Sequence, residues 1–234
     1  MTEHSGPAPE DIARHYERSH ERIVELVRSL SAEQVATAVV ATPGWDVHDV
    51  LAHLAGITTD GLSGRITGVP SDEFTGSQVR ERKAATVDEL VAEWKGNLGQ
   101  MLDAARAGFV PANLAVDAVT HEQDIRGAVG APRVPDREAV RFALDVYSSG
   151  LRYRVRKAGG PALRVEASDS DFAVDAGDGA PQATLRAGEF DLFRTLSGRR
   201  GRDEVLAMDW DGDGTAFLGL LNLFGEVPDY AVND

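Results

Sequence analysis

The chain has 234 residues, a formal net charge of −14 and no cysteine. The absence of cysteine excludes a disulfide scaffold, a cysteine-ligated metal site and a cysteine nucleophile, and an acidic chain is a poor partner for nucleic-acid phosphates. A hydrophobic fraction of 42% and a charged fraction of 26% are typical of a globular protein.

Residues 1–9 lack the basic and apolar regions of a signal peptide, so we expect a disordered lead-in there. No stretch of about 18 consecutive apolar residues is present, so neither a membrane span nor a membrane partner is expected. The expected location is therefore the cytoplasm. Only three of the 24 basic residues are lysine, which is typical of a genome rich in G and C.

Four segments carry apolar residues at helical spacing, and capping residues stand at the start of several of them. Four amphipathic helices of this length predict an antiparallel four-helix bundle. A capping box at residues 31–34 predicts one further short helix. The four long segments are residues 10–30, 46–54, 86–102 and 111–129.

A polar, glycine-rich stretch at residues 61–83 separates the second and third of these helices. We expect a loop here, and a loop of this length inside a compact domain is often a lid or a binding loop. A merely tolerated excursion of the chain is an equal alternative.

One more helix is predicted at residues 136–157, and the pattern of apolar residues changes after it. Short alternating segments separated by Asp, Gly and Pro then predict strands, followed by a helix, a further strand and a last helix. We therefore expect an α+β protein, with a bundle and connecting helix over residues 10–157 and a small α+β domain over residues 158–234. These later segments are residues 163–167, 172–175, 183–186, 189–196, 205–210 and 215–224.

Two histidines and one aspartate form the best candidate site. Asp117 and His121 are spaced i, i+4, so they project from one helix face, and His53 lies on the edge of the apolar stripe of another helix. Such a set suits a divalent metal with one open position, and Asp124 could orient His121 from behind. By spacing alone, a surface Asp–His pair and two satisfied core histidines are the commoner explanations.

Three segments carry a resemblance to a known family. PGWDVHDVLAHLAG at residues 43–56 resembles the signature of the mycothiol-dependent maleylpyruvate isomerase family, which belongs to the DinB-like four-helix superfamily of metal-dependent enzymes. DAVTHEQDIR at residues 117–126 looks like the family's fourth-helix motif. GEFDLFRTLSGRR at residues 188–200 resembles a helix end of its small sterol-carrier-like C-terminal domain, and WDGD at 210–213 is similar to that domain's closing pattern.

The resemblance implies a function and a set of roles. His53, Asp117 and His121 would ligate a divalent metal, zinc above all, and Arg199 would pair with a substrate carboxylate. The cofactor would be mycothiol, whose metal-bound thiolate attacks an electrophilic small molecule in a transferase or isomerase reaction. A protein that borrows its thiol in this way needs no cysteine of its own.

Asp117 departs from the family pattern, which has a glutamate at this position. The shorter side chain draws the carboxylate back by about 1.5 Å, which leaves three alternatives: a closer helix, ligation through water, or a weak or empty site.

The alternative function is a non-catalytic small-molecule-binding module with a weakened or empty metal site. A third reading, an interaction protein that uses residues 61–83, is disfavoured because that stretch has few apolar residues.

Overall fold

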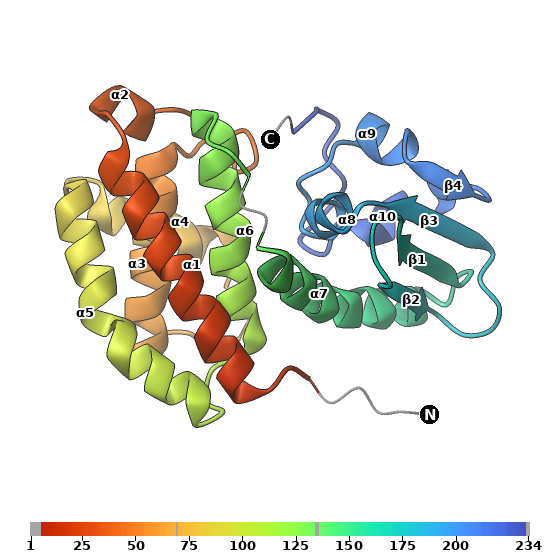
Figure 1. Cartoon of the computed structure of the whole chain (residues 1–234), viewed down its shortest axis with the longest axis horizontal. Helices are drawn as coiled ribbons and strands as arrows, with labels where there is room; N and C mark the ends of the chain where they lie inside the picture. The colour runs from red at the N-terminus through yellow and green to blue at the C-terminus, as the bar shows by residue number, and fades with distance from the viewer. Residues whose placement is uncertain (1–5, 69, 134–135, 233–234) are drawn as a thin grey trace. The chain divides into compact units, whose positions relative to one another are not determined.

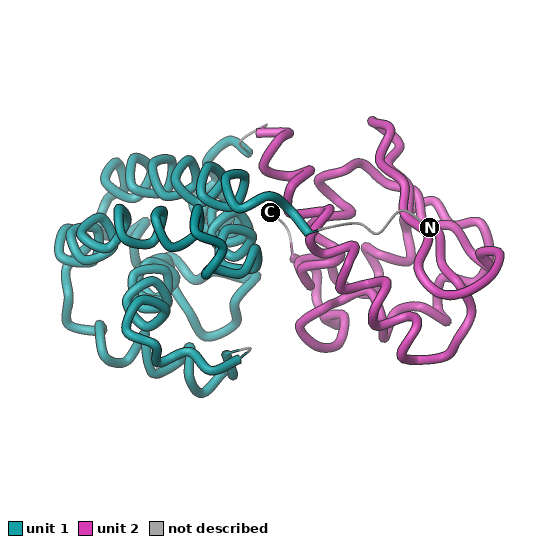
Figure 2. The backbone as a smooth tube through the Cα atoms, turned by 90° about the horizontal axis from the view of Figure 1, so that it is seen from below, with its two compact units in different colours: residues 1–134, 234 teal, residues 135–233 magenta. Residues whose placement is uncertain are grey.

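A computed structural model describes residues 6–68, 70–133 and 136–232 of the chain. The chain forms two compact units, which divide between Val134 and Pro135 (Figure 2). The first is helical and the second contains a small sheet, so the expected α+β class is confirmed.

The first unit is a bundle in which four long helices form a ring. Helix α1 packs against α5 and α6, and α3 packs against the same two neighbours (Figure 1). Apolar faces of these helices fill the core, so the four-helix prediction is confirmed. The helices of the unit are α1 (Pro9–Ser29), α2 (Ala32–Val35), α3 (Val47–Leu62), α4 (Asp72–Arg82), α5 (Val87–Arg106) and α6 (Ala112–Val129).

Local capping sets where several of these helices begin. The side chain of Asp46 accepts a hydrogen bond from the backbone N–H of Asp49 and starts α3. Thr86 and Glu89 form the predicted capping box at the start of α5. Because such contacts lie within three residues, the sequence alone locates these helix starts.

A buried polar network lies at the centre of the bundle. Trp94 Nε1 donates to Tyr16 Oη at 2.7 Å, and Tyr16 Oη lies 2.6 Å from Thr58 Oγ1. Thr58 Oγ1 donates its own hydrogen to the carbonyl of Leu54, so the tyrosine must donate to the threonine. Burial raises the pKa of Tyr16 to about 12, which keeps this donor protonated. The network ties α1, α3 and α5 together.

The stretch at residues 61–83 is not the loop that the sequence predicted. It contains helix α4, which begins after the N-cap Ser71 and packs against α3. Only Gln78 and Val79 of this helix are buried. An apolar stripe is therefore missing, and without one hydrophobic periodicity cannot reveal a helix.

The second unit is a four-stranded sheet with helices packed on it. The strand order is β2-β1-β3-β4; β1 and β3 run parallel, and the two outer pairs are antiparallel. The unit contains α7 (Arg137–Ala158), β1 (Leu163–Ala167), β2 (Ala173–Ala176), β3 (Ala183–Ala187), α8 (Glu189–Leu196), α9 (Arg202–Leu206), β4 (Asp209–Asp211), η1 (Gly214–Phe217) and α10 (Leu218–Leu221).

Two expectations for the second unit need correction. The strand predicted at residues 205–210 is divided between the end of α9 and the start of β4, because a turn of helix capped at Gly201 precedes the strand. The last predicted helix, at residues 215–224, is shorter and begins as a 3₁₀ turn.

The boundary between the units precedes α7 instead of following it near residue 158. Helix α7 packs against α8 and β2, and Arg141 Nη1 donates to Glu189 Oε1 at 2.9 Å. The expected connecting helix of the bundle is thus part of the second unit, since its apolar face is covered there.

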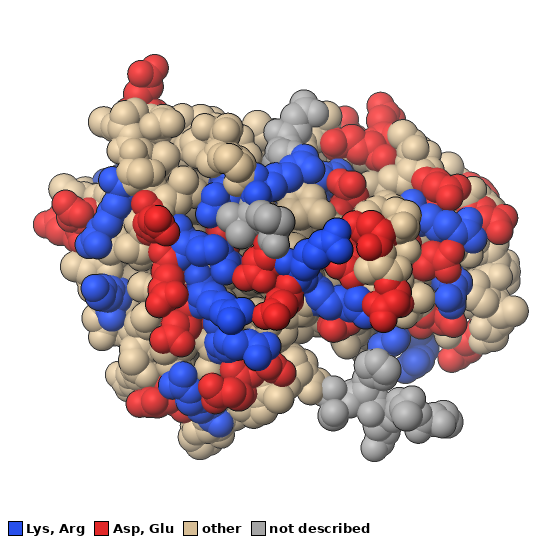
Figure 3. Space-filling model, viewed as in Figure 1, with Lys and Arg blue, Asp and Glu red and all other residues tan. Residues whose placement is uncertain are grey.

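The N-terminal lead-in was expected over residues 1–9. Residues 1–5 lie outside the described part, and α1 begins at Pro9. Within the described residues, none of the helices has the length and apolar character needed to cross a membrane. Acidic and basic side chains are interspersed over the face shown in Figure 3.

Candidate metal centre

The candidate residues come from two neighbouring helices of the bundle. His53 lies in the middle of α3, and Asp117 and His121 lie one turn apart on α6. Helices α3 and α6 pack against each other. Both imidazoles are buried, with 4% and 5% of their surface exposed, whereas the Asp117 side chain is 35% exposed.

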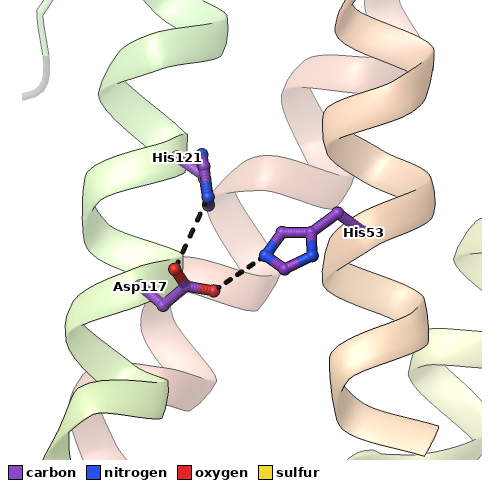
Figure 4. Close-up of side chains that lie close together, drawn as sticks. All are labelled: His53, Asp117 and His121. Carbon is purple, nitrogen blue, oxygen red and sulfur yellow. Dashed lines mark hydrogen bonds and ion pairs between the residues drawn. The ribbon is translucent and has the colours of Figure 1, made fainter. Parts of the chain in front are cut away.

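The three side chains converge on one point (Figure 4). Asp117 Oδ2 lies 3.3 Å from His53 Nε2, and Asp117 Oδ1 lies 3.5 Å from His121 Nε2. The two rings approach edge to face, with centroids 5.2 Å apart. One ligand atom from each residue lies within 4.8 Å of the other two.

The other nitrogen of His121 faces a buried carboxylate. Nδ1 lies 2.9 Å from Asp124 Oδ2, as expected if Asp124 orients the ring. A carboxylate can only accept, so Nδ1 carries the hydrogen and donates it. The lone pair of the neutral ring is then on Nε2, which points at Asp117.

His53 has the same tautomer as His121, but its Nδ1 faces a side-chain amide instead of a carboxylate. Gln78 Nε2 donates to Asp60 Oδ2 at 2.7 Å, which turns Gln78 Oε1 toward His53 Nδ1 at 2.8 Å. His53 Nδ1 therefore donates, and its Nε2 also presents a lone pair.

The convergent atoms fit a cation. Two imidazole lone pairs and a carboxylate face one another, and this arrangement is favourable only with a cation, a metal ion or a proton, between them. Two ligand atoms at about 2.1 Å from a tetrahedral zinc lie about 3.4 Å apart, which matches the separations of Asp117 from the two histidines.

Those separations also bear on the shortened side chain at the family's glutamate position. The oxygens of Asp117 already lie as far from the two imidazole nitrogens as two ligands of one zinc ion lie from each other. The alternative of a closer approach, with direct ligation, is thus the one that the geometry favours.

A second cluster, Asp46, His48 and Asp49, lies at the start of α3. Both carboxylates take part in the helix cap, and Lys83 Nζ lies 2.8 Å from Asp49 Oδ1. His48 Nε2 contacts the carbonyl of Ala85 at 2.7 Å. The ammonium group already supplies the positive charge, so this cluster is a poor metal site.

Other residues singled out from the sequence have local roles. Trp45 packs beside His53, with ring centroids 5.3 Å apart. Arg199 belongs to the second unit and follows α8, where its Nη1 donates to the carbonyl of Ser197 at 2.5 Å.

Sequence reasoning missed Gln78 and Asp60, which form the polar surroundings of His53. Gln78 lies on the unpredicted helix α4. Asp60 is seven residues after His53 on α3, so it lies on the same helix face. The spacing of His53 and Asp60 was the one signal in the sequence that the two side chains lie near each other. An aspartate buried on that face requires a hydrogen-bond partner.

Comparison with known proteins gives one family model and two solved structures similar to this chain. Residues 16–126 match the family model of the mycothiol maleylpyruvate isomerase N-terminal domain. Comparison with curated protein sequences gives no significant match.

Two solved structures share the fold: the mycothiol-dependent maleylpyruvate isomerase, at 14% identity, and a histidine-to-alanine mutant of it, at 13%. Each match covers 95% of this chain and 96% of the other, with a TM-score of 0.57. Residues 16–126 therefore resemble the mycothiol maleylpyruvate isomerase N-terminal domain family, and the chain shares the fold of that isomerase.

Proposed function

We propose that the protein is a metal-dependent, mycothiol-dependent transferase or isomerase that acts on a small electrophilic molecule in the cytoplasm. The observation that carries this proposal is the convergence of His53 Nε2, His121 Nε2 and the Asp117 carboxylate, with both Nδ1 atoms already donating elsewhere.

The three residues would hold a divalent metal ion. Two nitrogen ligands and one oxygen ligand are a donor set of catalytic zinc sites, in which three protein ligands leave one position open. A metal bound there supplies a Lewis acid that lowers the pKa of a thiol beside it.

Two further residues of the chain keep both histidines in the tautomer that a metal ion requires. Asp124 and Gln78 accept from the two Nδ1 atoms, so that both rings keep Nε2 available. Asp117 is the most exposed of the three ligands, and a small molecule would therefore enter on its side.

The thiol itself must come from outside the chain, because the protein contains no cysteine. Mycothiol is proposed on the strength of the family match. For the substrate, Arg199 is the proposed partner of a carboxylate group, since its planar guanidinium suits two parallel hydrogen bonds.

The test combines metal analysis with a thiol-transfer assay on the purified chain. Wild-type protein should carry about one zinc or similar ion per chain and convert an electrophile in a reaction that requires mycothiol. His53→Ala and His121→Ala should lose both properties. His48→Ala is the matched control, since this histidine lies on the same helix as His53 but outside the cluster, and it should keep both.

A fully stable wild-type protein that takes up no metal after supplementation would overturn the proposal. If native mass spectrometry then found a co-purified small molecule, the alternative of a non-catalytic binding module would stand instead.

A further inference from the structure

A chain of polar contacts leads from His53 to the surface of the bundle. His53 Nδ1 contacts Gln78 Oε1 at 2.8 Å, and Gln78 Nε2 donates to Asp60 Oδ2 at 2.7 Å. Arg65 Nη1 lies 2.8 Å from Asp60 Oδ1, and Arg65 Nη2 lies 3.2 Å from Glu81 Oε1. The inner three side chains are buried, whereas Arg65 and Glu81 are about half exposed.

The donor and the acceptor of each hydrogen bond in this chain follow from the Arg65–Asp60 pair near the surface. Arg65 pairs with Asp60, whose carboxylate can only accept hydrogen bonds. The amide of Gln78 must therefore turn its nitrogen toward Asp60 and its oxygen toward His53. That oxygen in turn requires a hydrogen on Nδ1 of the imidazole.

Helix α4 reaches this position because α3 leaves room for it. A Cβ atom on Gly56 would lie 2.8 Å from the Cβ of Gln78 and 2.9 Å from Arg82 Nη1, closer than side chains approach. Glycine inside a helix costs about 1 kcal/mol relative to alanine. The close approach of α4, one turn after His53, accounts for a glycine at this point.

Guanidinium groups contact α4 near both of its ends. Arg82 pairs with Glu93 of α5 at 2.6 Å, and Arg65 pairs with Glu81 near the same end of the helix. The guanidinium of Arg65 also lies 5.9 Å from the ring centroid of Phe74, in the first turn.

We propose that Gln78 and Asp60 are positioning residues that fix the tautomer and orientation of His53, and that α4 serves the metal centre in this way. The inference rests on the proposed function, and it assigns to the stretch at residues 61–83 a task other than that of a lid. Outer partners of this kind change metal affinity by about 10- to 100-fold.

The first test reads the tautomer directly in the metal-free protein. Long-range ¹H–¹⁵N spectra, at a pH above the imidazole range, should show His53 with its hydrogen on Nδ1. In Gln78→Met, which keeps the volume but removes the acceptor, the hydrogen should shift toward Nε2. Asp60→Asn can offer either an oxygen or a nitrogen to Gln78, and should give a mixture of tautomers. An unchanged Nδ1–H tautomer in both variants would overturn the inference.

The second test measures zinc affinity with a competing chelator. Gln78→Met should weaken binding by about 10- to 100-fold, and Gly56→Ala should do the same by pushing α4 away. Arg80→Ala is the matched control, because its side chain is exposed on the same helix, and it should bind like the wild type. Thermal unfolding of the metal-free variants separates this effect from a loss of fold.

The two proposals fail in different ways. If His53→Ala abolishes zinc binding while Gln78→Met binds zinc as tightly as wild type, the positioning role is refuted and the metal centre stands. If the wild type binds no zinc, the proposed function is refuted, and the tautomer experiment still decides whether Gln78 and Asp60 control His53.

Discussion

At the scale of single residues, the site depends on which nitrogen of each imidazole carries a hydrogen. His121 and His53 meet this requirement with different partners: a carboxylate three residues away on the same helix, and an amide from another helix. Asp124 could be inferred from the i, i+3 spacing. Gln78 could not, because it is 25 residues away in sequence and reaches His53 only through packing.

Asp117 gives the first prediction at this scale. Asp117→Asn keeps the size of the side chain and removes the anionic ligand, so we expect zinc affinity to fall by at least about 100-fold, more than for an outer partner. Asp117→Glu should bind no more tightly than wild type, because the aspartate oxygens already lie at ligand distance. Tighter binding by the glutamate variant would mean that Asp117 is too short to ligate.

His20 gives a prediction about pH and stability. Burial against Trp94 lowers its pKa to about 4, since desolvation disfavours the charged ring. The unfolded chain therefore binds the proton more readily. Stability is highest above the ordinary histidine pKa of about 6.5 and falls as the pH drops toward 4, by about 2 kcal/mol between neutral pH and pH 5.

Urea unfolding at these two pH values checks the His20 prediction against His20→Phe, which cannot titrate. The stability difference between the proteins should change by about 2 kcal/mol. Equal pH dependence of the two would contradict the assignment to this residue.

At the scale of elements, the helix that carries Asp117 and His121 is fixed to α1 by a buried ion pair. Glu122 is fully buried, and Arg22 Nε and Nη2 donate to its carboxylate at 2.8 and 2.7 Å. Arg126 Nε adds a further contact at 3.2 Å. Such a pair fixes the register of α6 beside α1, because a displaced helix would leave the carboxylate buried without its partner.

Arg22→Met tests this link. Removing Arg22 takes the closer guanidinium from the fully buried Glu122 carboxylate and leaves the contact with Arg126 at 3.2 Å, so we expect a loss of up to about 3 kcal/mol in unfolding free energy. Arg28→Met is the control on the same helix: its side chain is half exposed and lies 4.0 Å from Asp88, and its loss should be much smaller. Similar losses in chemical denaturation would show that burial of Glu122 does not matter.

The helix starts and the unpredicted helix α4 show what kind of element a sequence reveals. The capping boxes that begin at Asp46 and Thr86 join residues three positions apart, so they can be recognised from the sequence alone. Helix α4 lacks an apolar stripe, and its main contacts are polar ones to residues of α3, α5 and the preceding turn. Hydrophobic periodicity reveals a helix by its buried apolar face, and α4 buries almost no apolar residues.

At the scale of the whole molecule, the position of α7 decides how the chain divides. Its apolar face packs on α8 and β2, so a fragment of residues 1–133 keeps the bundle intact, with the three candidate ligands and their partners. We expect this fragment to fold and to bind zinc as the full chain does.

A fragment of residues 1–157 provides the comparison. It adds α7 without the elements that cover its apolar face, so it should be less soluble than the shorter fragment. Sedimentation and zinc titration of the two fragments check this prediction. If the longer fragment were the more stable and monomeric one, α7 would belong to the bundle.

The sequence alone determined the α+β class, the four helices of the bundle and the placement of His53, Asp117 and His121 on their helices. These features depend on periodicity and capping within a few residues, which are local properties. Only the tertiary structure decided that the three side chains converge, that α7 joins the sheet, and that α4 brings Gln78 to His53. Contacts between distant segments follow from how helices pack, and packing at Gly56 is not visible in any local pattern.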